Sequence, residues 1–321
     1  MRALLTLTLG VLLAACAGTA AAQAFPNRPV RLVVAFPAGG GTDIVARVVA
    51  QPLSELWGQQ VIVDNRGGAS GVIGTEFVAR QPADGYTLLL GTLGNLAVNQ
   101  HLFQKMAVDP LTAFAPITQV VDVYFVLLAY PGLPVKNVPE LIALAKSKPG
   151  QLTYSSSGSG GAPHLAAELF KRMARVDLVH VPYKGSAPSF QDLMGGQVSV
   201  TFDSQIQALP FIKDGRLRPL AVLGKTRAPQ LPDVPTVAES LPGYELTNWF
   251  GLVAPAATPK DVLAKIHADV AKVLENPELR TRIADMSAAV VGNTPEQFRA
   301  TWQADSAKWG RVVKETNMRA D

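Results

Sequence analysis

The residues best suited to bind a small ligand form a glycine-rich segment near the start of the chain, Ala38-Gly39-Gly40-Gly41-Thr42-Asp43. The apolar run 30–36 before it has the β-branched composition of a buried strand, and apolar residues follow at helical spacing over 44–49. Backbone N–H groups at the start of a helix have no partners within the helix and attract carboxylate or phosphate. The segment therefore predicts an anion-binding loop between a strand and a helix. The alternative is a tight turn in which Thr42 or Asp43 caps the helix.

The same pattern recurs in the second half of the chain at Ser155-Ser156-Ser157-Gly158-Ser159-Gly160. A strand-like run precedes this loop, and a helix with Pro163 and His164 near its start follows it. Two such loops facing each other would suit a molecule with carboxylates at opposite ends. A Ser/Gly loop can also be only a flexible connection, and His164 could contact the ligand or serve helix packing and capping instead.

Tyr183 and Asp203 each follow a predicted strand. Ligands of open α/β sheets bind outside the carboxyl ends of the strands, so both side chains are candidates for contact with the ligand. Tyr183 could stack on the ligand or hydrogen-bond to it, and Asp203 could hold an amino or hydroxyl group. The structural alternatives are a tyrosine packed on a turn and an aspartate that caps a helix.

Patterns typical of enzymes and nucleic-acid-binding proteins are missing from the sequence. No serine lies in a G-x-S-x-G elbow, and the glycines at 39–41 match neither the P-loop nor the dinucleotide-binding fingerprint. The histidines are scattered and Cys16 is the only cysteine, so we expect no metal, no cofactor and no thiol nucleophile in the fold. The formal net charge of +4 is not gathered in a basic block, which gives no support to nucleic-acid binding. Glycoside hydrolysis by paired carboxylates stays open, since spacing alone does not reveal such a pair.

Residues 1–22 have the features of a secretory signal peptide. A short basic start, Met1-Arg2, precedes the apolar stretch 3–15, and small residues at 20–22 offer a cleavage site. The stretch is too short to span a membrane. Leu13-Ala14-Ala15-Cys16 resembles the lipobox at which bacteria acylate a cysteine, so the mature protein is either released or anchored through Cys16. In both cases we expect an exported protein.

Predicted strands and helices alternate along the chain, which is typical of α/β proteins with parallel sheets covered by helices on both faces. About 300 residues follow the signal peptide, which favours two domains. Segments 117–122 and 246–253 are candidates to carry the chain between them. We therefore predict a first lobe of residues 23–119 and 248–321 and a second lobe of 120–247, joined by a hinge of two chain crossings. The expected strands are 30–36, 61–63, 86–90, 117–129, 152–155, 178–181, 198–202, 217–223 and 289–291, and the expected helices are 42–57, 71–81, 95–103, 139–147, 163–173, 186–194, 205–214, 259–275 and 295–315.

Several motifs resemble, in the same order, those of the periplasmic substrate-binding proteins of tripartite tricarboxylate transporters, the Bug or TctC-like family. The resemblance covers nearly the whole chain after the signal peptide. Ala38 stands where many relatives carry a proline, a change that could alter the stiffness of the loop without removing its donors. The motifs are Phe36-Pro37-Ala38-Gly39-Gly40-Gly41-Thr42-Asp43, Asn65-Arg66-Gly67-Gly68-Ala69-Ser70-Gly71-Val72-Ile73-Gly74, Asp84-Gly85-Tyr86-Thr87-Leu88, Val181-Pro182-Tyr183-Lys184-Gly185, Phe202-Asp203, Pro232-Asp233-Val234-Pro235-Thr236 and Trp249-Phe250-Gly251-Leu252-Val253-Ala254-Pro255.

This resemblance implies a two-lobed periplasmic binding protein of type II, a Venus-flytrap fold that closes on a small organic carboxylate. It implies that backbone amides, hydroxyls and waters of the two glycine loops, 38–43 and 155–161, hold the ligand. It also implies a periplasmic protein that is not an enzyme and delivers its ligand to a transporter with large and small integral membrane subunits. We expect a monomer. A periplasmic sensor for a two-component system is the alternative function, and a periplasmic hydrolase is a third.

Overall fold

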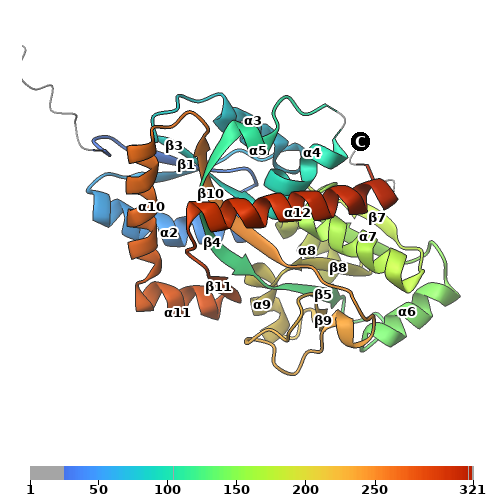
Figure 1. Ribbon diagram of the computed structural model, residues 1–321. Helices are drawn as coiled ribbons and strands as arrows, with labels where there is room; N and C mark the ends of the chain where they lie inside the picture. Colours follow the sequence, from blue (N-terminus) through green and yellow to red (C-terminus); the bar gives the residue numbers. More distant parts are fainter. Residues whose placement is uncertain (1–24, 104, 317, 320–321) are drawn as a thin grey trace, which may run out of the picture.

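The computed structural model describes residues 25–103, 105–316 and 318–319, so the predicted signal peptide and Cys16 lie outside the described residues. The strands belong to two sheets, one in each of two lobes (Figure 1). The strands are β1 (Val30–Val34), β2 (Val61–Asn65), β3 (Thr87–Thr92), β4 (Phe114–Val123), β5 (Phe125–Ala129), β6 (Thr153–Ser156), β7 (Val179–Pro182), β8 (Val200–Ser204), β9 (Arg218–Val222), β10 (Asn248–Pro255) and β11 (Ala288–Val290).

Both sheets are mixed, which corrects the prediction of parallel sheets. In the first lobe the strand order is β11-β4-β10-β3-β1-β2, and β10 runs antiparallel to β3 and β4. In the second lobe the order is β7-β6-β8-β5-β9, and β5 runs antiparallel to β8 and β9. The predicted parallel pairs do form, among β1, β2 and β3 and among β6, β7 and β8. The chain enters the second lobe as β5 and returns to the first as β10, and each of these two strands is antiparallel to both of its neighbours.

Most helices lie where the alternation predicts them. The helix α11 is an addition to the prediction, although Asn276 and Pro277 give it a cap and a first-turn proline. The helix expected over 95–103 begins instead as a π-helical turn. The helices are α2 (Gly41–Trp57), α3 (Val72–Ala79), α4 (Asn99–Leu102), α5 (Pro110–Ala113), α6 (Val138–Ser147), α7 (Ala162–Ala174), α8 (Ser186–Met194), α9 (Gln205–Lys213), α10 (Lys260–Leu274), α11 (Pro277–Asp285) and α12 (Pro295–Thr316), with the π turn η2 (Gly94–Val98) and the 3₁₀ turns η1 (Ala69–Gly71) and η3 (Val237–Glu239).

The chain crosses between the lobes twice. It leaves the first sheet through β4, passes Tyr124 and enters the second sheet as β5, and it returns to the first sheet as β10. Figure 1 shows α12 running across the front of the molecule towards α7 of the second lobe. Trp302 of α12 donates to Leu96 O of the first lobe at 2.8 Å, and Glu315 pairs with Arg172 of α7 at 3.1 Å. The last helix therefore contacts both lobes. Within the described residues, no helix is long and apolar enough to cross a membrane.

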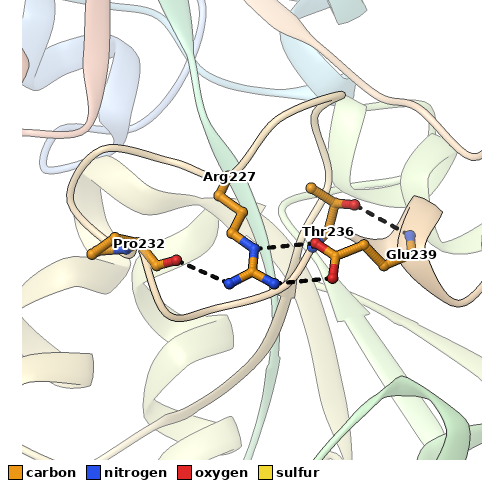
Figure 2. A network of polar contacts seen from close by, with 4 residues as sticks. All are labelled: Arg227, Pro232, Thr236 and Glu239. Atoms are coloured by element: carbon orange, nitrogen blue, oxygen red, sulfur yellow. Dashed lines mark hydrogen bonds and ion pairs between the residues drawn. The ribbon is translucent and has the colours of Figure 1, made fainter.

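Arg227 organises the loop between β9 and β10 in the second lobe. Figure 2 shows its guanidinium donating to the two carboxylate oxygens of Glu239, at 3.1 and 3.0 Å, and to the carbonyl of Pro232 at 3.2 Å. Glu239 also accepts from Thr236 N, while Thr236 Oγ1 accepts from Glu239 N. This reciprocal pair is a capping box at the start of η3. The motif at 232–236 thus shapes the path by which the chain returns to β10.

Candidate functional site

A cavity of about 80 Å³ lies between the two lobes. The first lobe lines it with the loop between β1 and α2 and with β10, and the second lobe with loops that follow β6, β7 and β8. The cavity shares Phe36, Pro37, Ser157, Lys184 and Gly185 with a larger adjoining cavity of about 750 Å³. The lining residues are Phe36, Pro37, Ala38, Gly40, Gly41, Thr42, Thr92, Phe125, Ser157, Gly161, Ala162, Pro163, Lys184, Gly185, Ser186, Ala187, Pro188, Asp203, Ser204, Gln207, Asn248 and Phe250.

Three helices begin at this cavity with a glycine as N-cap: α2 at Gly40, α7 at Gly161 and α8 at Gly185. Glycine has no side chain to accept from the first N–H groups of a helix, and no other side chain among the described residues caps these starts. Their N–H groups and the positive ends of the helix dipoles can therefore serve an anion. The start of α2 approaches the cavity from the first lobe, and the other two approach it from the second.

The first predicted loop, 38–43, is held in shape by Asp43. Its Oδ2 accepts from Gly39 N at 2.9 Å and from Arg47 Nε at 3.0 Å. Burial alone would raise the pKa of Asp43, but the hydrogen bonds from Arg47, Gly39 and Asn65 outweigh it and hold the pKa below its usual value. Gly39 has a φ of +80°, a left-handed conformation that favours glycine. Asp43 therefore supports the loop from within. The loop residues that line the cavity are Ala38, Gly40, Gly41 and Thr42.

Hydroxyl groups hold the second predicted loop, 155–160. Ser156 Oγ accepts from Gly158 N at 3.3 Å and lies 3.0 Å from Gly158 O, to which it can donate. Ser189 Oγ donates to Ser155 Oγ at 2.7 Å. Ser155 and Ser156 are fully buried, so they support the loop from the interior. Ser157 lines the cavity, and together with Gly158 and Ser159 it also lines an adjoining cavity.

His164, the third residue of α7, supports the same loop. Its Nδ1 accepts from Gly160 N at 2.9 Å, which places the proton of the neutral ring on Nε2. The ring stacks on His180 with centroids 4.2 Å apart, and His180 stacks in turn on Tyr154 at 4.7 Å. His180 Nε2 lies 2.6 Å from Ser156 Oγ. Burial lowers the pKa of both histidines to about 4, so both rings are neutral at pH 7.

Two hydrogen bonds join the lobes beside the cavity. Gln207 Nε2 of α9 donates to Gly39 O of the first lobe at 2.6 Å. Ser70 Oγ of η1 donates to Ser159 O in the second loop. Gly158 has a φ of +136°, and a Cβ at this position would lie 2.7 Å from Ser70 Oγ, so the close approach of the lobes requires a glycine here. These contacts hold the lobes against each other around the cavity.

The two remaining predicted residues lie in different places. Tyr183 OH donates to Asp192 Oδ2 at 2.6 Å, and burial together with this bond raises the pKa of Tyr183 to about 12. Tyr183 lines the adjoining cavity and not the main one. Asp203 lines the main cavity, and its Oδ1 accepts from Ser204 N at 2.7 Å. Burial raises the pKa of Asp203 to about 6, against the opposing effect of the hydrogen bond from Ser204 N and of the neighbouring Ser186 hydroxyl.

Sequence reasoning misses several lining residues because they belong to elements at the lobe crossings. Phe125 begins β5, and Asn248 and Phe250 belong to β10, a strand that the sequence analysis treats as a connection. Asn248 and Phe250 are two residues apart, so they point to the same face of the strand. Gln207 lies in the first turn of α9, just after Asp203. Its position past the carboxyl end of β8 is a signal that could have identified it.

The geometry favours binding of an anion over catalysis. Ser156 and His180 are in hydrogen-bond contact, as in a hydrolase, but Ser156 is fully buried and its hydroxyl is already shared with Gly158. In the described part of the chain, no three His, Cys, Asp or Glu side chains gather as metal ligands would. The charged side chains in the cavity lining are Lys184 and Asp203. An anion at this site would therefore meet backbone N–H groups, hydroxyls and the side chain of Lys184.

Comparison with known proteins gives relatives that match over nearly the whole chain. The family model described as Tripartite tricarboxylate transporter family receptor matches residues 45–318. Protein BugT of Bordetella pertussis is 37% identical over 307 residues, which cover 94% of this chain and 94% of BugT. The solved structure of R. palustris Rpa4515 with adipate has a TM-score of 0.89 and 39% identity, covering 92% of this chain and 99% of that one. MatC (Rpa3494) from Rhodopseudomonas palustris with bound malate has a TM-score of 0.86 and 33% identity, covering 90% of this chain and all 100% of MatC.

Proposed function

Because the chain belongs to the tripartite tricarboxylate transporter receptor family, we propose that it captures a small organic carboxylate between its lobes and delivers it to a membrane transporter. Proteins of this family are solute-binding proteins and not enzymes. Two similar structures hold adipate and malate, both small dicarboxylates, which supports the same chemical class for this chain.

The observation that carries the proposal is the convergence of three glycine N-caps on one cavity between the lobes. A carboxylate there would accept hydrogen bonds from the first turns of α2, α7 and α8. Hydrogen bonds to a charged group contribute about 1.5–3 kcal/mol each, so a few of them support tight binding without an arginine. The loops 38–43 and 155–160 would supply these contacts, with hydroxyl donors from Thr42 and Ser157.

We propose further that the ligand holds the lobes closed. In this proposal, residues 23–119 and 248–321 move against residues 120–247 about the two crossings. A ligand favours the closed state only through contacts that the open state lacks, and donors on both lobes meet this requirement. Small-angle scattering should show a smaller radius of gyration when the protein is saturated with ligand. Identical curves with and without ligand would contradict closure on binding.

A thermal-shift screen tests the carboxylate function. The panel contains mono-, di- and tricarboxylates, hydroxy acids and acidic amino acids, each at matched ionic strength. A ligand at about 100 times its dissociation constant should add about 2.7 kcal/mol to the free energy of unfolding. The matched control is the diamide of each diacid that binds, which keeps the carbon chain but lacks the charge and should give no shift. The absence of a shift with every carboxylate would contradict the proposal.

The proposed setting is the periplasm, where a monomeric receptor meets a transporter with one large and one small integral membrane subunit. Light scattering on the purified protein should give the mass of one chain, and a dimer mass would contradict the monomer. Intact mass of the mature protein distinguishes removal of residues 1–22 from acylation at Cys16.

A further inference from the structure

Three buried polar side chains are among those that line the cavity, and together they are here called the acceptor wall: Asp203 at β8, Gln207 in α9 and Asn248 in β10. Their exposed fractions are 2%, 9% and 3%. Asp203 Oδ2, Gln207 Oε1 and Asn248 Oδ1 each lack a hydrogen-bond partner among the described residues. Buried acceptors in folded proteins are almost always satisfied, so three at one cavity point to a partner that comes from outside the chain.

Two of these acceptors are fixed in orientation. Gln207 Nε2 donates to Gly39 O at 2.6 Å, and turning the amide over would instead bring Oε1 against that carbonyl oxygen. Asp203 Oδ1 accepts from Ser204 N at 2.7 Å, which leaves Oδ2 for a second partner. Asn248 can present either its oxygen or its nitrogen, because turning its amide exchanges the two. Asp203 and Gln207 therefore define what the wall requires, which is a hydrogen-bond donor.

The rest of the cavity has the opposite character. The starts of α2, α7 and α8 present N–H groups, which suit the oxygens of a carboxylate. A second carboxylate placed at the acceptor wall would meet the oxygens of Asp203 and Gln207 and be repelled, whereas an amino or hydroxyl group would satisfy them. One molecule that satisfies both parts of the cavity carries a carboxylate and, a short distance away, a donor.

This inference rests on the proposed carboxylate function and names its substrate class. We propose that the ligand is a carboxylate that also carries an amino or hydroxyl group, and that Asp203 and Gln207 accept hydrogen bonds from that group. Asn248 adapts to the remainder of the ligand. Amino acids and hydroxy acids are then the preferred ligands, and plain aliphatic diacids bind more weakly.

Titration calorimetry with chain-matched ligands tests this class. One series is succinate, malate and aspartate, and a second is glutarate, 2-hydroxyglutarate and glutamate. In at least one series the hydroxy or amino member should bind roughly tenfold tighter or more than the plain diacid, as expected for one satisfied charge-assisted hydrogen bond. The hydroxy and amino members separate the two kinds of donor.

Substitutions in the acceptor wall test whether its residues cause the preference for the donor-bearing ligand. Asp203→Asn retains an oxygen for Ser204 N and places an amide nitrogen where Oδ2 lies, so the preference for the donor-bearing ligand should shrink to about threefold or less. Gln207→Met removes the second acceptor. It should also reduce the ratio of the affinity for the donor-bearing ligand to the affinity for the plain diacid, even if both affinities change. Asp305→Asn is the matched control, because this carboxylate accepts from Trp249 Nε1 at 2.7 Å outside the cavity lining. The ratio of the two affinities in Asp305→Asn should equal that of the wild type.

The outcomes separate the inference from the function on which it rests. Equal affinities for plain and donor-bearing members in both series would overturn the inference and leave the carboxylate receptor intact. A preference that survives unchanged in both Asp203→Asn and Gln207→Met would overturn the assignment to the acceptor wall. Failure of every carboxylate to bind would overturn the proposed function and the inference together.

Discussion

Helices α6 and α11 at the surface begin differently from α2, α7 and α8 at the cavity, where a fourth helix, α9, is capped by Ser204 Oγ, which accepts from Ile206 N at 3.2 Å. At the surface, Asn137 caps α6 by accepting from Glu140 N at 2.9 Å, and Asn276 caps α11 in the same way. At the cavity, α2, α7 and α8 begin at glycines and their first N–H groups have no side-chain cap from the described residues. An asparagine cap stabilises its helix by about 1 kcal/mol relative to alanine whether or not a ligand is present. The difference teaches that the side-chain caps of α6 and α11 serve stability, whereas the glycine starts of α2, α7 and α8 leave donors that a ligand can use.

Giving a cavity start a cap of its own should produce the largest effect. In Gly40→Asp, the new carboxylate would bond to the first N–H groups of α2 and repel the ligand. Gly40 has a φ of −76°, and a Cβ there meets only Pro37 O at 3.4 Å, so the fold should accept the change. Loss of two charge-assisted hydrogen bonds at about 1.5 kcal/mol each predicts a fall in affinity on the order of 100-fold by calorimetry.

Gly40→Ala is the control for this substitution. It adds a Cβ but neither a charge nor an acceptor, so the N–H groups stay free and affinity should remain within about threefold of the wild type. Equal affinity for Gly40→Asp and Gly40→Ala would break the comparison, because the start of α2 would then have no role in binding.

Acidification should lower the free energy of unfolding through His164 and His180 at α7. The Asn137 side chain that caps α6 does not titrate. The folded pKa of His164 and His180 is about 4, below the ordinary value of 6.5. Between these values the unfolded chain binds protons that the folded chain does not, so the free energy of unfolding decreases as pH falls from about 6.5 to about 4. For the buried His164 alone we expect a decrease on the order of 2 kcal/mol. Urea denaturation at a series of pH values measures it, and His164→Asn should flatten the profile. A profile as steep as that of the wild type would contradict this assignment.

Loss of the hydrogen bond from Gly160 N to His164 should weaken ligand binding, because the second loop would no longer be held in position. His164→Leu removes the acceptor for Gly160 N, so we expect roughly a tenfold loss of affinity, the equivalent of one hydrogen bond to a charged group. His164→Asn can place Oδ1 near the position of Nδ1 and should restore most of the affinity. Calorimetry compares the three proteins at pH 7. Equal losses in both variants would mean that packing of the ring, and not its acceptor, matters.

The smallest effect should come from a surface start. Asn137→Ala removes the side-chain cap of α6 and should lower the free energy of unfolding by about 1 kcal/mol. Affinity for the ligand should not change, because α6 begins away from the residues that line the cavity. Denaturation and calorimetry on the same preparation measure both quantities. A loss of affinity similar to that of Gly40→Asp would remove the distinction between the two kinds of start.

The sequence predicts the loops of the site better than the walls between them. A glycine run after a β-branched strand is a local signal, and the structure places Ala38, Gly40, Gly41 and Thr42 in the cavity lining. Asp203 is also found by a local rule, the end of a strand. By contrast, the apolar run at β10 could be a connection or a central strand. Its partners β3 and β4 decide between the two, and they are far away in the sequence. Asn248 and Phe250 are missed with it.

The orientation of side chains is the other part that sequence reasoning leaves open. Whether His164 contacts a ligand or holds a loop depends on its rotamer, and the bond from Gly160 N shows the second arrangement. The cross-lobe bond of Gln207 to Gly39 O joins residues 168 positions apart and has no local signature. The mixed sheets are missed for a similar reason, since the antiparallel pairing of β5 and β10 depends on partners that are far away in the sequence.

A crystal structure with the ligand found by the thermal-shift screen tests the central claim most directly. The measured quantity is the distance from each carboxylate oxygen of the ligand to the backbone nitrogens in the first turns of α2, α7 and α8. We predict hydrogen bonds of about 2.7–3.2 Å to nitrogens from both lobes. A carboxylate that pairs with Lys184 alone, while the N–H groups at Gly40, Gly161 and Gly185 and in the turns that follow bond only to water, would contradict the account.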